Sequence, residues 1–218
     1  MPAPLPHSTP RPARVPARGL WRAAALVAVG LLVACGDAHA DLPPHDPEAD
    51  RLLAFVTGDA WDGVFAGDGG ARYRVETASG DTTAAVGNPL PAFLSDEPPY
   101  LDAAAREQYE TRLAGDTTVA GVAATLVEAE FVADGRRTQP VRYVRAAVDS
   151  ASGALLAVEI RREVASTLYD ESSRLRADLA RGPGGRPALV PGSADIRTTT
   201  DVPLSDARTE RLAWRLVP

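Results

Sequence analysis

The second half of the chain alternates between apolar and polar residues in short runs, and this pattern constrains the fold more than any other feature. Turn signals separate the runs, which lie at residues 109–113, 118–131, 141–148, 154–163, 166–169, 173–179, 196–202 and 208–217. Side chains of a strand point alternately to opposite faces, so each run can bury one apolar face. We therefore predict an antiparallel meander of short strands.

The clearest hairpin signal is the Asp-Ser-Ala-Ser-Gly sequence at residues 149–153, between two of the best runs. Gly153 can take the positive φ that such loops often require. We predict that residues 141–148 and 154–163 pair antiparallel across this loop. In the first strand, we predict that the side chains of Val144, Ala146 and Val148 point to one face of the sheet. Those of Tyr143 and Ala147 should point to the opposite face. Two more loops are expected at residues 133–137 and 181–187.

The first half of the chain shows fewer strand signals. Residues 47–56 carry an apolar stripe, acidic residues at their start and Gly58 after their end, which predicts a helix of about three turns. Residues 71–77 alternate as a strand does, and residues 101–109 favour a short helix. The acidic Gly-rich stretch between them contains Asp59, Asp62 and Asp68. Their spacing fits no EF-hand, and Asp-Gly pairs more often mark turns, so we expect turns there and no calcium site.

Residue usage excludes several kinds of chemistry. All 23 basic residues are arginines, which rules out a Schiff-base lysine and a P-loop lysine. The three histidines and the single cysteine, Cys35, lie before residue 46, so a domain that starts near residue 48 has no Ser-His-Asp or Cys-His catalysis and no disulfide. Four of the arginines lie before residue 35, leaving 19 basic against 29 acidic residues. No clustered cationic face is apparent, which argues against nucleic acid as the main partner.

Two groups of residues contain side chains suited to a metal site or to acid–base catalysis. His39 and His45 with Asp41 and Asp46 offer metal-ligand types, but a flexible tether lacks the surrounding groups that orient ligands, so we expect no metal and no cofactor. Glu128 and Glu130 share one face of a strand, and paired carboxylates can perform acid–base catalysis. Without a histidine, a lysine or a metal cluster beside them, a solvated outer face is the better expectation. We therefore expect a protein that is not an enzyme.

The N-terminal segment has the features of an export signal. Four arginines and several prolines precede an uncharged apolar run at residues 23–34, which is shorter than the ~20 residues of a membrane-spanning helix. The run ends in Leu-Val-Ala-Cys-Gly at residues 32–36, which resembles the bacterial lipobox. This resemblance implies that Cys35 is diacylated and becomes the new N-terminus. We expect a signal peptide at residues 1–34, a polar proline-rich tether at 35–47 and a folded domain at 48–218.

The position after the cysteine bears on localisation. By resemblance to the enterobacterial sorting rule, Gly36 in place of aspartate favours the outer membrane, facing the periplasm, over the inner membrane; Asp37 one place later weakens the inference.

The segment from Tyr109 to Arg162 resembles a known superfamily. Residues 109–121 end in Gly-Asp-Thr-Thr-Val-Ala-Gly, and residues 143–161 contain the Asp-Ser-Ala-Ser-Gly hairpin between two strands. These motifs are similar to those of the outer-membrane lipoprotein-sorting superfamily, which includes LolA-like and LolB-like proteins and RseB-like stress sensors. The closing residues 201–214 also suit a final strand of such a protein.

This resemblance implies a mainly β (α+β) fold: an antiparallel curled sheet, an unclosed half-barrel, with one or two short helices across its open face. It also implies an apolar concave surface that holds acyl chains. Only about 40 residues separate Val56 from Pro98, so we expect a half-barrel that is small or lacks strands.

Three functions remain open. The favoured hypothesis is an envelope lipoprotein, anchored in the membrane through Cys35, whose half-barrel binds an acyl chain or a lipoprotein for sorting or envelope sensing. The alternatives are a structural or partner-binding envelope lipoprotein without a small ligand and a carboxylate-dependent hydrolase of glycans. The alternating strands make five residues the candidate ligand contacts, about half of which should lie on the convex side: Val141, Tyr143, Leu156, Val158 and Trp214. For any one of them, a place in the sheet core is the competing expectation.

Overall fold

The computed structural model describes residues 43–56, 71–93, 97–133, 139–149, 151–181 and 187–217. They contain one α-helix, α2 (Pro47–Leu53), and two short 3-10 helices, η1 (Leu90–Ala92) and η2 (Arg106–Gln108). The nine strands are β1 Arg72–Thr77, β2 Thr82–Val86, β3 Tyr109–Val119, β4 Val122–Phe131, β5 Val141–Asp149, β6 Leu155–Ala165, β7 Asp170–Arg181, β8 Pro187–Asp201 and β9 Arg208–Leu216.

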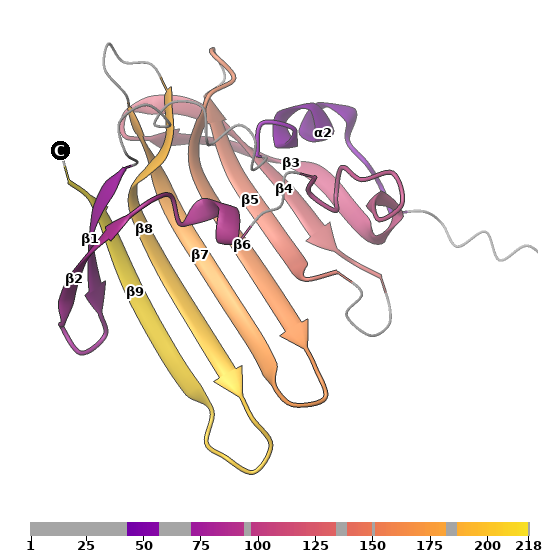
Figure 1. The fold of residues 1–218 in the computed structure, drawn as a ribbon. Coiled ribbons are helices and arrows are strands. Elements are labelled where there is room, and N and C mark those ends of the chain that lie inside the picture. The colour runs from indigo at the N-terminus through magenta and orange to yellow at the C-terminus, as the bar shows by residue number, and fades with distance from the viewer. Residues whose placement is uncertain are drawn as a thin grey trace, which may run out of the picture. The chain divides into compact units, whose positions relative to one another are not determined.

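All nine strands belong to one antiparallel sheet in the order β2-β1-β9-β8-β7-β6-β5-β4-β3. From β3 to β9 each strand pairs with the next one along the chain, and the β1–β2 hairpin is added at the β9 edge (Figure 1). Within the described residues, β2 and β3 form the two edges and do not pair with each other. The prediction of an antiparallel, unclosed half-barrel is therefore confirmed.

Two strands of the nine-stranded sheet, β1 and β2, come from the chain before Tyr109, where a small sheet or missing strands were expected. β1 was predicted, and it pairs with β9. β2 was not predicted, because four of its five residues are exposed and it has no apolar face that a sequence pattern could reveal. These two strands lengthen the sheet at its C-terminal edge.

The central hairpin prediction is confirmed. β5 pairs antiparallel with β6, with Val144 opposite Ile160 and Ala146 opposite Val158. The backbone N–H of Gly153 donates to the Asp149 carbonyl at 2.8 Å, and Gly153 has φ +71°. Val144, Ala146 and Val148 lie in the main core, and the side chain of Tyr143 lies on the opposite face, where it reaches Glu128.

Two strand predictions are wrong at hairpins. Residues 118–131 do not form one strand, because Ala120 and Gly121 make a two-residue turn between β3 and β4 with positive φ at both positions. That is the backbone of a type I′ turn, which usually carries Asn-Gly, and alanine in the first position conceals it from sequence inspection. Residues 166–169 form the β6–β7 loop, in which the Ser166 hydroxyl accepts from the backbone N–H groups of Leu168 and Tyr169.

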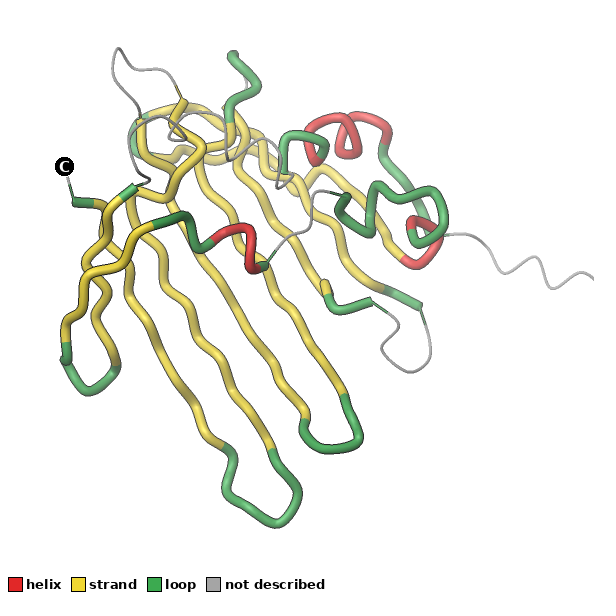
Figure 2. The backbone as a smooth tube through the Cα atoms, in the orientation of Figure 1, coloured by secondary structure: helices red, strands yellow, loops and turns green. Residues whose placement is uncertain are grey.

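The helices are shorter than predicted. Helix α2 begins after Asp46, whose carboxylate accepts from the backbone N–H groups of Glu48 and Ala49, and it ends at Leu53 after seven residues. Residues 101–108 form turns and η2 in place of the predicted short helix, and Tyr109 already belongs to β3. The predicted loops at 133–137 and 181–187 and the stretch containing Asp59, Asp62 and Asp68 fall largely or wholly outside the described residues. The backbone trace in Figure 2 shows how little of the domain is helical.

Candidate functional site

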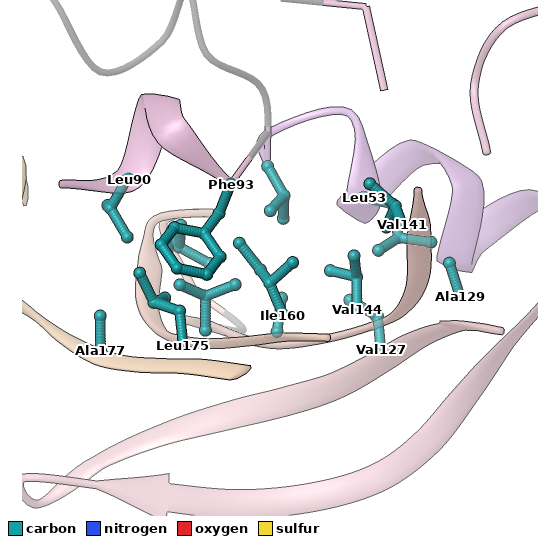
Figure 3. Packing of buried hydrophobic residues seen from close by; sticks show 14 of the residues in the cluster. Leu53, Leu90, Phe93, Val127, Ala129, Val141, Val144, Ile160, Leu175 and Ala177 are labelled. Atoms are coloured by element: carbon teal, nitrogen blue, oxygen red, sulfur yellow. The ribbon is translucent and has the colours of Figure 1, made fainter. Parts of the chain in front are cut away.

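The inner face of the sheet, defined as the face that α2 and η1 cover, carries an apolar core from β4 to β9. Its buried residues contact side chains of the covering segments (Figure 3). Those covering residues are Leu52, Leu53, Val56, Leu90, Phe93 and Tyr100. Between β4 and β7 the buried inner-face residues of this core are at most 4% exposed, and, of the described residues there, only Phe131 and Leu179 at strand ends pack against it while partly buried, so the protein's own side chains occupy most of this part of the predicted concave surface.

Hydrogen bonds hold the covering segments in place. The Tyr100 hydroxyl donates to the Val56 carbonyl at 3.0 Å, and the Tyr109 hydroxyl donates to the Val141 carbonyl at 2.7 Å. Burial raises the pKa of both phenols far above the ordinary tyrosine value, so they remain donors at every physiological pH. Asp50 of α2 accepts from the Thr111 hydroxyl at 2.6 Å and pairs with Arg106 at 2.5 Å.

The five predicted ligand contacts occupy different environments. Val141 and Val158 are buried in the main core at 4% and 3% exposure. Leu156 lies at an irregularity of the β5–β6 pairing and is half-buried. Tyr143 is on the outer face, so it is not part of the concave surface. Trp214 is on the inner face and only partly buried.

Trp214 lies where two hydrophobic clusters meet. Its ring meets that of Tyr73 edge to face, with ring centroids 5.3 Å apart, and its neighbours on this part of the inner face include Leu212 and Leu216. Burial raises the pKa of Tyr73 to about 12. The indole Nε1 of Trp214 is buried and has no hydrogen-bond partner among the described residues. Buried indole nitrogens usually have one, so this donor departs from the usual pattern.

The outer face carries a row of directly paired charges across six strands, which we call the charge ladder. Its members alternate in sign and are Arg112, Glu128, Arg145, Glu159, Arg176 and Asp195. Cross-strand pairs of opposite charge stabilise a sheet, which explains how this face tolerates so many ionised groups.

Glu128 corrects one prediction. It lies on the outer face, as expected, but it is only 7% exposed and is not simply solvated. Its carboxylate pairs with Arg112 at 2.7 Å and Arg145 at 3.3 Å and accepts from the Tyr143 hydroxyl at 2.7 Å. Burial alone would raise the pKa of Glu128, but the hydrogen bonds from Tyr143 and Arg112 outweigh it and lower the pKa. The group is therefore held as a carboxylate.

Glu159 contacts three arginines on the outer face. Its carboxylate lies 2.8 Å from Arg161, 2.7 Å from Arg174 and 2.8 Å from Arg176. Burial opposes ionisation, but the hydrogen bonds from the three arginines prevail and lower the pKa of Glu159 to about 2. Burial and the hydrogen bond to Glu128 raise the pKa of Tyr143 to about 12.

A second row on the outer face holds four arginines in directly paired positions, which we call the arginine row. The pairs are Arg161 with Arg174, Arg174 with Arg197 and Arg197 with Arg211. The expectation that no cationic cluster exists is wrong for this face. These residues lie 13, 23 and 14 positions apart in the chain, so only the strand register brings them together. The sequence carries no local signal for them.

The remaining predicted site residues are placed as follows. His45 and Asp46 do not lie in a free tether, because the backbone of residues 44–46 pairs with Thr111 at the β3 edge. Cys35, His39 and Asp41 are outside the described residues. Within the described ranges, no cluster of three or more His, Cys, Asp and Glu side chains forms a potential metal site. Among those same residues, no helix is long and apolar enough to span a membrane.

Comparison with known proteins adds no family to this geometry: no family model matches the chain, and no curated protein matches it.

Proposed function

We propose that the chain is a lipid-anchored protein of the bacterial envelope whose sheet binds the hydrocarbon of a lipid or lipoprotein on its inner face. The same proposal includes that the chain is related to the lipoprotein-sorting superfamily and that it is located at the outer membrane. The anchor rests on an arginine-bearing start, an apolar run of suitable length and Cys35 at the end of that run. Two acyl chains on this cysteine would hold the protein stably at a membrane.

The observation that carries the binding proposal is the incomplete covering of the inner face along β9 and at the end of β7. Leu179, Leu212 and Trp214 are only partly buried, although they contact the main core. Further toward β5 the same face is completely covered. A hydrocarbon chain that lies against these three side chains would extend the core without displacing α2 or η1.

Hydrophobic burial is sufficient to drive such binding. Each buried methylene contributes about 0.8 kcal/mol, so about twelve methylenes contribute about 10 kcal/mol. Association costs at least about 4 kcal/mol in lost freedom, which leaves about 6 kcal/mol at most and an affinity of roughly tens of micromolar or weaker.

The geometry changes which residues are assigned to the ligand. Trp214 is kept as the principal contact, and Leu212 joins it. Val141 and Val158 support the site from the core, since the covering segments already contact them. Tyr143 lies on the outer face, where its hydroxyl donates to Glu128 of the charge ladder, so it is not assigned to the ligand.

A second candidate is a partner-binding or structural envelope lipoprotein without a small ligand. It is favoured by exposed apolar side chains at two adjacent hairpin tips, β6–β7 and β8–β9, where Leu168 is 74% exposed and Leu204 is fully exposed. No comparable observation favours the alternative of a carboxylate-dependent glycan hydrolase. Its general acid needs a raised pKa, whereas that of Glu128 is lowered.

A lipid titration tests the proposal. The full chain with Cys35→Ser, which removes any acyl anchor, is titrated with a fluorescent fatty acid. We expect saturable binding with an affinity of roughly tens of micromolar or weaker, insensitive to salt, and about tenfold weaker binding for Trp214→Ala. Leu204→Ala removes an exposed apolar side chain elsewhere and should change nothing. Absence of saturable binding, or equal binding by Trp214→Ala, would favour the second candidate.

The anchor has its own test. Metabolic labelling of the unaltered full chain with radioactive palmitate should label it, and Cys35→Ser should abolish the label. Retained label in this variant would refute the lipidation of Cys35.

A further inference from the structure

The arginine row on the outer face is unfavourable for the sheet alone. Like charges directly opposite each other on neighbouring strands repel. Here Arg161, Arg174, Arg197 and Arg211 make three such pairs in succession. Neighbouring strands lie about 4.8 Å apart, so the row spans roughly 14 Å. The concentration of positive charge is local, because the chain as a whole carries a net charge of -6.

The carboxylates near this row do not neutralise it. Glu159 contacts Arg161 and Arg174 but also Arg176, and Asp195 pairs with Arg211. Among the described residues, Arg197 has no ion pair, and its side chain is exposed. The centre of the row therefore has a guanidinium group whose donors are open to a ligand.

Hydroxyl groups border the arginines on the same face. Ser172 lies two residues from Arg174 on β7, and Thr199 lies two residues from Arg197 on β8; Ser172 and Thr199 are directly paired. Two guanidinium groups and two hydroxyl groups therefore lie next to one another on two neighbouring strands. A pocket of about 190 Å³ lies here, and its lining includes Arg161 together with these four residues. Glu163 also lines it and pairs with Arg142 at 3.5 Å.

The position of Arg161 is fixed at the end of the row. Its guanidinium stacks over the Tyr143 ring, 4.7 Å from the ring centroid, and donates to Glu159. One arginine is therefore held in place by stacking and a second, Arg174, by Glu159. Positioned donors lose less freedom when they bind an anion.

We propose that this pocket binds a phosphate group, either as free phosphate or as the phosphomonoester headgroup of a lipid. A phosphate has several acceptor oxygens, which match two arginine forks and two hydroxyl donors; a carboxylate has only two. A doubly charged anion also converts the repulsion along the row into attraction. The site lies on the face opposite to Trp214, so it stands or fails independently of hydrocarbon binding.

The test uses the full chain with Cys35→Ser and two probes. Inorganic phosphate is titrated while the arginine side-chain resonances are followed by NMR. Flotation is measured with phosphatidylcholine vesicles, with and without phosphatidic acid. Arg197→Gln should weaken binding about tenfold or more, because it removes a charge-assisted contact. Thr199→Ala should weaken it about threefold.

The matched control is Arg208→Gln. Arg208 is an exposed arginine of β9 that points to the inner face, so its loss changes the net charge equally without touching the pocket. Phosphate binding that depends on Arg197 identifies a site for free phosphate, and flotation with phosphatidic acid that depends on Arg197 identifies a lipid headgroup. Either result supports the proposal. Binding of neither probe, or equal loss in Arg208→Gln and Arg197→Gln, would overturn it.

Discussion

Replacing Glu159 by glutamine tests whether the outer face of the sheet is held together by its charges. Glu159→Gln keeps the size of the side chain but removes the anion that contacts Arg161, Arg174 and Arg176. These three arginines would then lie close to one another and to Arg197 with few carboxylates to offset the repulsion between their positive charges. We expect the free energy of unfolding to fall.

Two routes give the size of the effect. A pKa lowered from 4.5 to about 2 corresponds to roughly 3 kcal/mol of stabilisation. The arginine side chains are 39% to 61% exposed, so solvent screens this value and it is an upper bound. Three ion pairs of partly exposed groups contribute about 0.2–1 kcal/mol each. We therefore expect a loss of about 1.5–2 kcal/mol near neutral pH.

The pH dependence has a definite sign. The pKa of Glu159 is lower in the folded state, so its contribution is complete above about pH 4.5 and is lost as the pH falls toward about 2. The difference between the wild type and Glu159→Gln should thus shrink by about half or more between neutral pH and about pH 3. High salt should also reduce it.

Urea unfolding followed by circular dichroism, at both pH values and at two salt concentrations, measures these differences. Glu107→Gln is the control, because Glu107 is exposed and has no ion pair within the described part of the chain. A loss below about 0.5 kcal/mol, or a loss that is the same at both pH values, would refute the reasoning.

Two further changes test the packing and the turns. Tyr109→Phe removes the donor to the buried Val141 carbonyl, so it should cost about 1–2 kcal/mol in urea unfolding; an unchanged midpoint would show that this hydrogen bond does not hold β3 to β5. Ala120→Asn replaces an alanine at φ +50° with the residue favoured in a type I′ turn, and it should raise the melting temperature by a few degrees, corresponding to about 0.5–1 kcal/mol. A lower melting temperature would contradict the turn assignment.

The sequence was sufficient for the parts of the fold that depend on local alternation. The β5–β6 hairpin followed from the apolar and polar alternation on both sides of Asp149 and Gly153, because one face of each strand is buried. The β3–β4 turn did not follow, because Ala120 replaces the residue that normally marks such a turn. β2 is mostly exposed and could not be identified from periodicity.

The candidate sites were less accessible to sequence reasoning, because they depend on register. The sequence made Trp214 one of five candidates for the inner face, but it could not show which of the five face inward or that α2 and η1 cover the rest of that face. Tyr143 was included among the candidate ligand contacts because a tyrosine ring can lie on either face of a sheet, and its place in the sequence does not show which. The arginine row needs four strands in one exact alignment, and a shift of any strand by one residue would remove it.

Contact between bound hydrocarbon and Trp214 is the central claim, and a brominated fatty acid measures it directly. Bromine quenches tryptophan emission on contact, and the chain has three tryptophans, so the full chain carries Trp21→Phe, Trp61→Phe and Cys35→Ser. We predict saturable quenching of Trp214 by the brominated acid, with none from the unbrominated acid. Saturable binding that leaves the emission of Trp214 unchanged would contradict a hydrocarbon site on the inner face at β9.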